Sequence, residues 1–103
     1  MKIVWSKFAE TQLDKIYKYY ENKAGPKIAK KIIKGIISEP KKLIKAPLIG
    51  PKEELLLQRE FVYRYLIYKN YKLIYSIDTK NRFIKIADVF DTRQNPIKIK
   101  RIK

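Results

Sequence analysis

The chain has 103 residues, of which 25 are Lys or Arg and 10 are Asp or Glu, so its formal net charge is +15. Because it contains neither histidine nor cysteine, the sequence excludes disulfides, thiol nucleophiles, zinc sites with nitrogen or sulfur ligands, and acid–base catalysis by imidazole. With 46% hydrophobic residues, the composition is that of one folded domain over residues 1–103, not of a disordered chain.

The first half of the chain predicts a short strand followed by two helices. Residues 2–5 favour a strand, and Ser6 is a suitable N-cap for a helix over 7–23. Gly25 and Pro26 separate this helix from a second one over 26–39, which Pro40 ends. Because both segments repeat apolar residues at steps of three and four, we expect an antiparallel helical hairpin. The repeating residues are Phe8, Ala9, Leu13, Ile16, Tyr17 and Tyr20, then Ile28, Ala29, Ile32, Ile33, Ile36 and Ile37.

In the second half of the chain the apolar period falls from about 3.6 residues to about 2, which predicts strands. They are expected over 61–68, 71–77 and 82–90, after an ordered loop over 41–54. Turns are expected at 69–70, where Asn70 tolerates a positive φ, and at 78–81. The order β-α-α-β-β-β predicts an α+β fold in which the helical hairpin packs on one face of a twisted, mainly antiparallel sheet of three or four strands. The strand at 2–5 is expected at an edge or beside the last strand, and the opposite face of the sheet is expected to be free and cationic.

The excess of positive charge predicts an anionic partner, which could be nucleic acid, ribosome, a membrane surface or an acidic protein. The alternative is that the charge only keeps the protein soluble. The basic tail 96–103 is expected to form either an edge strand or a mobile arm that contacts phosphates or a protein. Apolar runs reach only about four residues, against the ~20 of a membrane span, so we expect a cytoplasmic protein without membrane contact. We also expect no metal and no cofactor.

Three stretches of the second half, 63–68, 71–75 and 86–96, form a recognisable pattern together with Trp5 and Ser6 at the start of the chain. The last stretch is the most specific, because its apolar strand closes on an Arg-x-x-Pro corner at Arg93 and Pro96. In order and spacing these stretches resemble the RelE/ParE toxin superfamily of bacterial type II toxin–antitoxin systems, over nearly the whole chain. The final corner resembles the ParE-like, plasmid-stabilisation members more closely than the RelE-like ones.

The resemblance implies a compact toxin that a cognate antitoxin neutralises by wrapping around it. Antitoxins of this kind resemble acidic, partly disordered segments that add a helix or a strand to the toxin. A charge of +15 is compatible with such a partner, because it steers the encounter before side chains are buried. Within the superfamily, RelE-like members cut messenger RNA in the ribosomal A site, whereas ParE-like members are associated with poisoning of DNA gyrase.

RNA cleavage would need groups that activate the 2′-hydroxyl, neutralise the phosphate and protonate the leaving oxygen. The candidate catalytic residues are Arg64, Lys69, Lys72, Arg82 and Arg93, with Tyr63, Tyr65 and Tyr68 for stacking or proton transfer. The candidates for binding a target or a phosphate are Arg59, Arg64, Lys72, Arg82 and Arg93.

The C-terminal segment favours a gyrase inhibitor over a nuclease. Ribonuclease members usually carry a Tyr, often with a His, after the last strand, whereas this chain has no tyrosine beyond Tyr75. The alternatives are a metal-independent, ribosome-dependent endonuclease that uses Lys, Arg and Tyr, and a non-toxic basic module that binds RNA or protein.

Several candidate side chains also have a purely structural interpretation. Arg64 shares a strand face with apolar residues, so it is either a phosphate clamp or a side chain that covers the edge of the core. Arg93 either reaches a target or forms a salt bridge with Asp88 or Asp91, and the sequence favours the salt bridge. Tyr63 and Tyr65 are either a base-stacking platform or core residues, and a core position is favoured.

Overall fold

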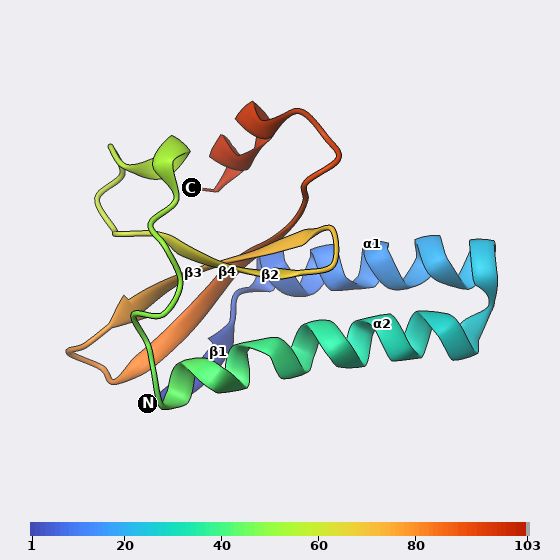
Figure 1. Ribbon diagram of the computed structural model, residues 1–103, viewed down its shortest axis with the longest axis horizontal. Helices are drawn as coiled ribbons and strands as arrows, with labels where there is room; N and C mark the ends of the chain where they lie inside the picture. The colour runs from blue at the N-terminus through green and yellow to red at the C-terminus, as the bar shows by residue number, and fades with distance from the viewer. Residues whose placement is uncertain (103) are drawn as a thin grey trace.

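The computed structural model describes residues 1–102 and confirms the predicted α+β order (Figure 1). The helices are α1 (Lys7–Ala24) and α2 (Pro26–Ser38). The strands are β1 (Lys2–Trp5), β2 (Arg64–Tyr68), β3 (Tyr71–Asp78) and β4 (Phe83–Asp91). Three short 3₁₀ helices complete the chain: η1 (Glu39–Ile44) and η2 (Glu54–Leu56) between α2 and β2, and η3 (Pro96–Arg101) after β4. None of the helices within residues 1–102 is long and apolar enough to cross a membrane.

The ends of α1 are fixed by the residues that the sequence singled out. The Ser6 hydroxyl oxygen accepts a hydrogen bond from the backbone N–H of Ala9 at 3.0 Å. The same hydroxyl donates to the carbonyl of Ala87 in β4 at 3.2 Å, which ties the start of α1 to the sheet. At the other end Gly25 takes a φ of 92°, where glycine is favoured, and Pro26 then begins α2.

The four strands are ordered β1-β4-β3-β2, so β1 lies both at an edge and beside the last strand. β1 runs parallel to β4, while β4, β3 and β2 are antiparallel neighbours. Lys69, and not Asn70, takes the positive φ of the first turn, at 52°, and Arg82 takes a φ of 58° in the second. β2 begins at Arg64 and not at residue 61, and the carbonyl of Tyr63 just before it accepts a hydrogen bond from the N–H of Glu53 at 2.8 Å.

The helical hairpin covers one face of the sheet, as predicted, and its outer turns extend beyond the sheet (Figure 1). The main core lies between these two layers and includes Ala9 of α1, Ile36 of α2, Leu73 of β3 and Ile86 of β4, all without solvent exposure. At Gly35, α2 comes so close to β2 that a Cβ atom would collide with the hydroxyl and ring of Tyr68.

The expectation of a free cationic face opposite the helices is wrong. A second, smaller core covers that face, with Ile74 and Phe90 of the sheet packed against Leu56 of η2 and Ile99 of η3. Segments far apart in sequence, η2 and η3, therefore lie side by side on this face (Figure 1).

The expectation of an edge strand or a mobile arm for the tail is also wrong for the part of it that the structure describes. The side chain of Asn95 accepts a hydrogen bond from the N–H of Ile97 at 3.1 Å, and Pro96 begins η3. This 3₁₀ turn buries Ile99 and leads to Ile102, which is buried as well. Lys103, the last residue of the predicted tail, lies outside the described residues.

Candidate target-binding site

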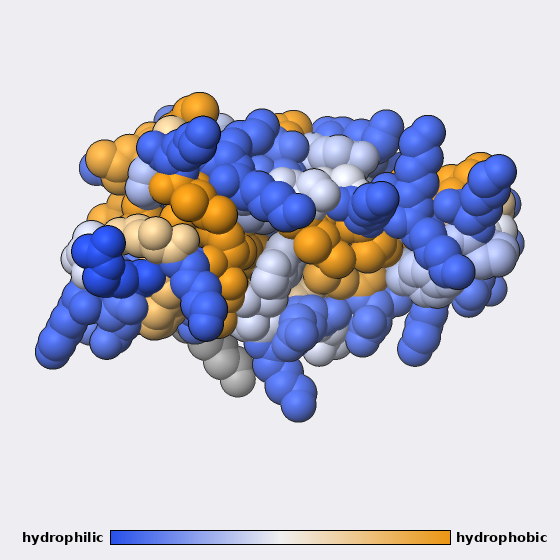
Figure 2. Space-filling model, turned by 90° about the horizontal axis from the view of Figure 1, so that it is seen from below, coloured by the Kyte–Doolittle hydropathy of each residue, from blue (hydrophilic) through white to orange (hydrophobic). Residues whose placement is uncertain are grey.

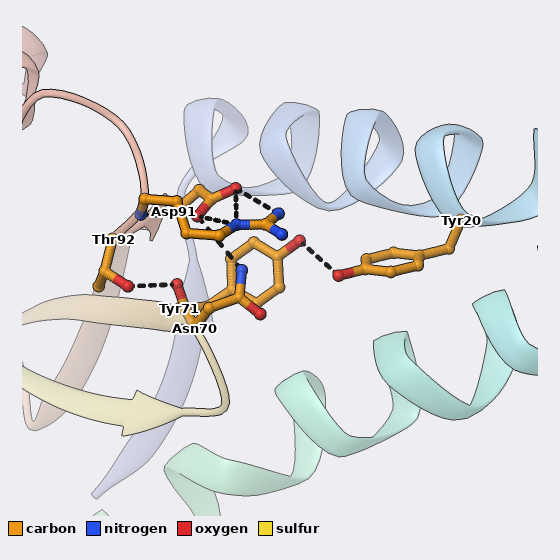
Figure 3. A network of polar contacts seen from close by, with 6 residues as sticks. Tyr20, Asn70, Tyr71, Asp91 and Thr92 are labelled. Atoms are coloured by element: carbon orange, nitrogen blue, oxygen red, sulfur yellow. Dashed lines mark hydrogen bonds and ion pairs between the residues drawn. The ribbon is translucent and has the colours of Figure 1, made fainter. Parts of the chain in front are cut away.

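The corner at the end of β4 is organised around the carboxylate of Asp91 (Figure 3). Asp91 accepts hydrogen bonds from the Asn70 side-chain amide at 3.2 Å, from the Arg93 backbone N–H at 2.9 Å and from the Arg93 guanidinium at 2.9 Å. The carbonyl of Asn70 in turn accepts from the N–H of Thr92 at 2.8 Å and from its hydroxyl at 2.9 Å. The β2–β3 turn and the end of β4 are thereby joined into one rigid corner.

Opposite charges dominate the electrostatics of this corner. The hydrogen bond from Arg93 is the largest cause that lowers the pKa of Asp91, and the same bond raises the pKa of the Arg93 guanidinium. Next to them, the hydroxyl of Tyr71 donates to the hydroxyl of Tyr20 on α1 at 3.4 Å (Figure 3). Burial, reinforced by that hydrogen bond, raises the pKa of Tyr71, so this phenol stays protonated at physiological pH.

The salt bridge of Arg93 confirms one of the two pairings expected from the sequence, with Asp91 and not with Asp88. The Arg93 side chain is still 57% exposed. It borders a hollow of about 210 Å³ between α1 and the corner, which Lys15 and Tyr19 also line. A partner that approaches this hollow meets positive charge.

Asp88 is paired with Arg101, a residue that the sequence analysis placed in a tail and did not select. The guanidinium of Arg101 donates to the fully buried carboxylate of Asp88 at 2.9 and 3.0 Å. It also lies 5.3 Å from the ring centres of both Phe8 and Phe90, within the range of cation–π interactions. A signal for this pair was present in the sequence, because an aspartate within the apolar stretch 86–90 requires a cationic partner when it is buried.

Arg59 and Arg64 are both occupied by backbone carbonyls. Arg59 donates to the carbonyl of Lys100 at 2.6 Å and to that of Ile102, so it holds η3 in place. Arg64 donates to the carbonyl of Gly50 at 2.8 Å and so fixes the loop before β2. Arg64 also lines a groove of about 560 Å³.

Lys72 projects from β3 toward Glu53, a buried acid that the sequence analysis did not select. The two side chains form a salt bridge of 2.7 Å, and the Lys72 ammonium lies 4.3 Å from the ring centre of Tyr65. Tyr63 is buried in the second core, which confirms the core interpretation for this residue. The hydroxyl end of the Tyr68 ring packs against Gly35 of α2, and the side chain is half-buried.

The remaining candidates, Lys69 and Arg82, are exposed residues in the turns at the two ends of β3. A strand of eight residues separates those turns by roughly 25 Å. The structure therefore does not gather the candidate cations around one point. Lys69 and Arg93 belong to one corner, because Asn70, next to Lys69, is bonded to Asp91, close to Arg93. Within residues 1–102 no cluster of acidic side chains could hold a metal ion.

The fold and this corner define a small, strongly basic α+β protein in which most of the selected cations stabilise its own structure. The sequence profile described as "ParE toxin of type II toxin-antitoxin system, parDE" matches residues 3–96. Since this is most of the chain, the protein belongs to the ParE toxin family of type II toxin–antitoxin systems.

The structure is also similar to a chain of the "Chromosomal ParDE TA system from P. aeruginosa". The two share 22% sequence identity and superpose with a TM-score of 0.73, over 88% of this chain and 95% of the other. At 22% identity this similarity shows that the two chains share a fold, and it shows nothing further about this chain. No curated protein matches the sequence.

Proposed function

We propose that this protein inhibits growth in the cytoplasm by binding DNA gyrase and that a cognate acidic antitoxin neutralises it. The observation that carries the proposal is the match of residues 3–96 to the ParE toxin family. The members that this sequence resembles are associated with gyrase poisoning.

The placement of the cations supports a protein target over RNA cleavage. A nuclease needs a base, an acid and a phosphate-binding cation around a single phosphate. Here Arg59 and Arg64 are bonded to carbonyls, and the carboxylate of Glu53 beside Lys72 repels a phosphate. Lys69 and Arg82 belong to opposite ends of β3, so they cannot share one phosphate.

The contact with the target is proposed at the Asp91 corner. Lys69 and Arg93 are exposed there, and the hydrogen bonds of Asn70 and Asp91 hold their backbones rigidly. A preorganised charged side chain loses little conformational freedom on binding. Arg82 lies outside this surface, in the other turn.

The proposal of an antitoxin partner is supported by charge and by structural similarity. The ParDE chain to which this structure is similar is described as part of a toxin–antitoxin system. A net charge of +15 accelerates encounter with an acidic protein and disfavours association between two copies of the chain.

The test is a supercoiling assay with purified DNA gyrase and relaxed plasmid. We expect the protein to inhibit supercoiling, and we expect Arg93→Ala to raise the inhibitory concentration by about tenfold, which corresponds to a contact of about 1.4 kcal/mol. Lys98→Ala, which removes an exposed positive charge on η3, is the matched control and should act like the wild type. If induction arrests growth while supercoiling is unaffected and primer extension shows cuts in translated messages, the endonuclease alternative replaces this proposal.

A further inference from the structure

The most exposed large apolar side chains gather in one part of the chain, away from the Asp91 corner. They are 57–65% exposed: Leu48, Ile49, Leu57, Phe61 and Val62. All of them lie between η1 and β2, at the end of the molecule opposite the tip of the helical hairpin, and Figure 2 shows apolar surface at that end. Isolated apolar residues are common on protein surfaces, but a group of this kind indicates a binding surface.

This apolar surface borders a groove of about 560 Å³. Its apolar lining includes Leu48, Phe61 and Val62, together with Ile77 of β3 and Met1. The volume is in the range of pockets that bind ligands, and it can accept several apolar side chains of a partner.

The part of the groove that Leu48 lines is held in place by hydrogen bonds within the protein. Two side chains donate hydrogen bonds to the backbone of the loop that carries Leu48. Tyr75 donates to the carbonyl of Pro47 at 2.8 Å, and Arg64 donates to the carbonyl of Gly50 at 2.8 Å. A preformed groove binds at a smaller entropic cost than one that must be ordered by its ligand.

Two cationic side chains, Lys52 and Arg64, line the groove, and further lysines precede Lys52 in the chain. Residues 41–52 contain four lysines, all exposed, and no acidic residue: Lys41, Lys42, Lys45 and Lys52. Lys42 is paired with Glu39, and Lys52 itself lines the groove. Among the residues that the structure describes, Glu60 is the one acidic residue that lines it. A second copy of the chain, which carries a charge of +15, is disfavoured as the occupant by repulsion.

We propose that the groove between Leu48 and Phe61 is the docking site for an acidic, amphipathic segment of the antitoxin. Apolar side chains of that segment enter the groove, and its carboxylates face Lys52 and Arg64, which line it. The inference rests on the proposed function for the identity of the partner, whereas the surface itself is defined by this chain. It also separates the two partners in space, with the antitoxin at the groove and the target at the Asp91 corner.

The experiment measures the affinity of this protein for the antitoxin encoded by the reading frame adjacent to its gene. The antitoxin is purified, labelled with a fluorophore and titrated with wild type, Leu48→Asp, Val62→Asp and Ile28→Asp. Ile28 is the matched control, because it is an exposed apolar residue on α2, outside the groove. Since all three side chains are largely exposed, we expect the variants to keep the thermal unfolding midpoint of the wild type, which circular dichroism checks.

We expect each groove variant to raise the Kd by about tenfold or more and the control to change it by less than about threefold. Equal binding by the groove variants and the control overturns the inference and leaves the proposed function standing. Failure of the wild type itself to bind the antitoxin overturns the proposed function and the inference with it.

Two further measurements identify a different occupant. If the groove variants bind the antitoxin normally but lose growth inhibition, the groove contacts the target and the inference is wrong. If they lose only sedimentation with phosphatidylserine vesicles, the groove contacts a lipid surface and the inference is equally wrong.

Discussion

The buried phenol of Tyr75 and the backbone of Gly50 are joined by a hydrogen bond of 3.0 Å, in which the Gly50 N–H is the donor. The same hydroxyl donates to the carbonyl of Pro47 at 2.8 Å. Gly50 is required at this position, because a Cβ atom would collide with the carbonyl of Tyr65. One β3 side chain thus attaches the loop before β2 to the main core.

We predict that Tyr75→Phe lowers the free energy of unfolding by about 1–3 kcal/mol, because it leaves a buried N–H without an acceptor. Urea denaturation monitored by fluorescence measures the change. Tyr19→Phe, at an exposed tyrosine on α1, is the control and should change stability by less than about 0.5 kcal/mol. If both variants are as stable as the wild type, the hydroxyl of Tyr75 does not hold the loop.

We predict that Gly35→Ala destabilises the protein even though alanine is the better helix former by about 1 kcal/mol. The new methyl group would collide with Tyr68, and overpacking of this kind costs about 1–3 kcal/mol. In the Tyr68→Leu background the collision is removed, so the same Gly35→Ala change should become neutral or stabilising. A double-mutant cycle by urea denaturation measures this coupling, and strict additivity would contradict the proposed contact.

The elements that the sequence predicts well are those with local signals. The steps of three and four in the helices, the serine before α1 and the glycine–proline pair after it all lie within a few residues of the structure they specify. The hairpin of β2 and β3 was predicted for the same reason, although its positive φ falls on Lys69, one residue before Asn70.

The second core was missed because its contacts are distant in sequence. Ile97 and Ile99 alternate with lysines, as in a strand, but Asn95 and Pro96 begin a 3₁₀ turn. Nothing local indicates that Ile99 then packs beside η2, more than 40 residues earlier in the chain.

The candidate site shows the same division between local and distant contacts. The pair of Asp91 and Arg93 is two residues apart, and the sequence predicted it. The pairs of Asp88 with Arg101 and of Glu53 with Lys72 are separated by 13 and 19 residues, and they depend on the tertiary fold. Charge alone therefore could not show which cations are already neutralised.

We predict that Arg101→Ala destabilises the protein by about 3–5 kcal/mol, because it leaves the carboxylate of Asp88 buried without a partner. Asp88→Asn in the same chain removes the buried charge and should recover part of the loss. Thermal unfolding by circular dichroism measures both variants. If Arg101→Ala alone unfolds at the temperature of the wild type, the carboxylate is solvated and the pair has no structural role.

We predict that the stabilisation from Arg93 depends on pH. Because Arg93 lowers the pKa of Asp91 in the folded state below its value of about 3.9 in the unfolded chain, the contribution is complete above about pH 4. It is lost as the pH falls through the folded-state pKa, since both states then bind the proton. Because the pair is exposed and screened by solvent, Arg93→Gln should lower the stability only slightly at pH 6.

The measurement is urea denaturation of the wild type, Arg93→Gln and Lys98→Gln at pH 6 and at pH 2.5. Lys98→Gln removes the same amount of positive charge from an exposed site on η3, so it corrects for the change in overall repulsion at low pH. We expect Arg93→Gln to be less stable than Lys98→Gln at pH 6, and we expect this difference to shrink at pH 2.5. A difference that is the same at both pH values would show that the carboxylate of Asp91 does not depend on Arg93 for its ionisation.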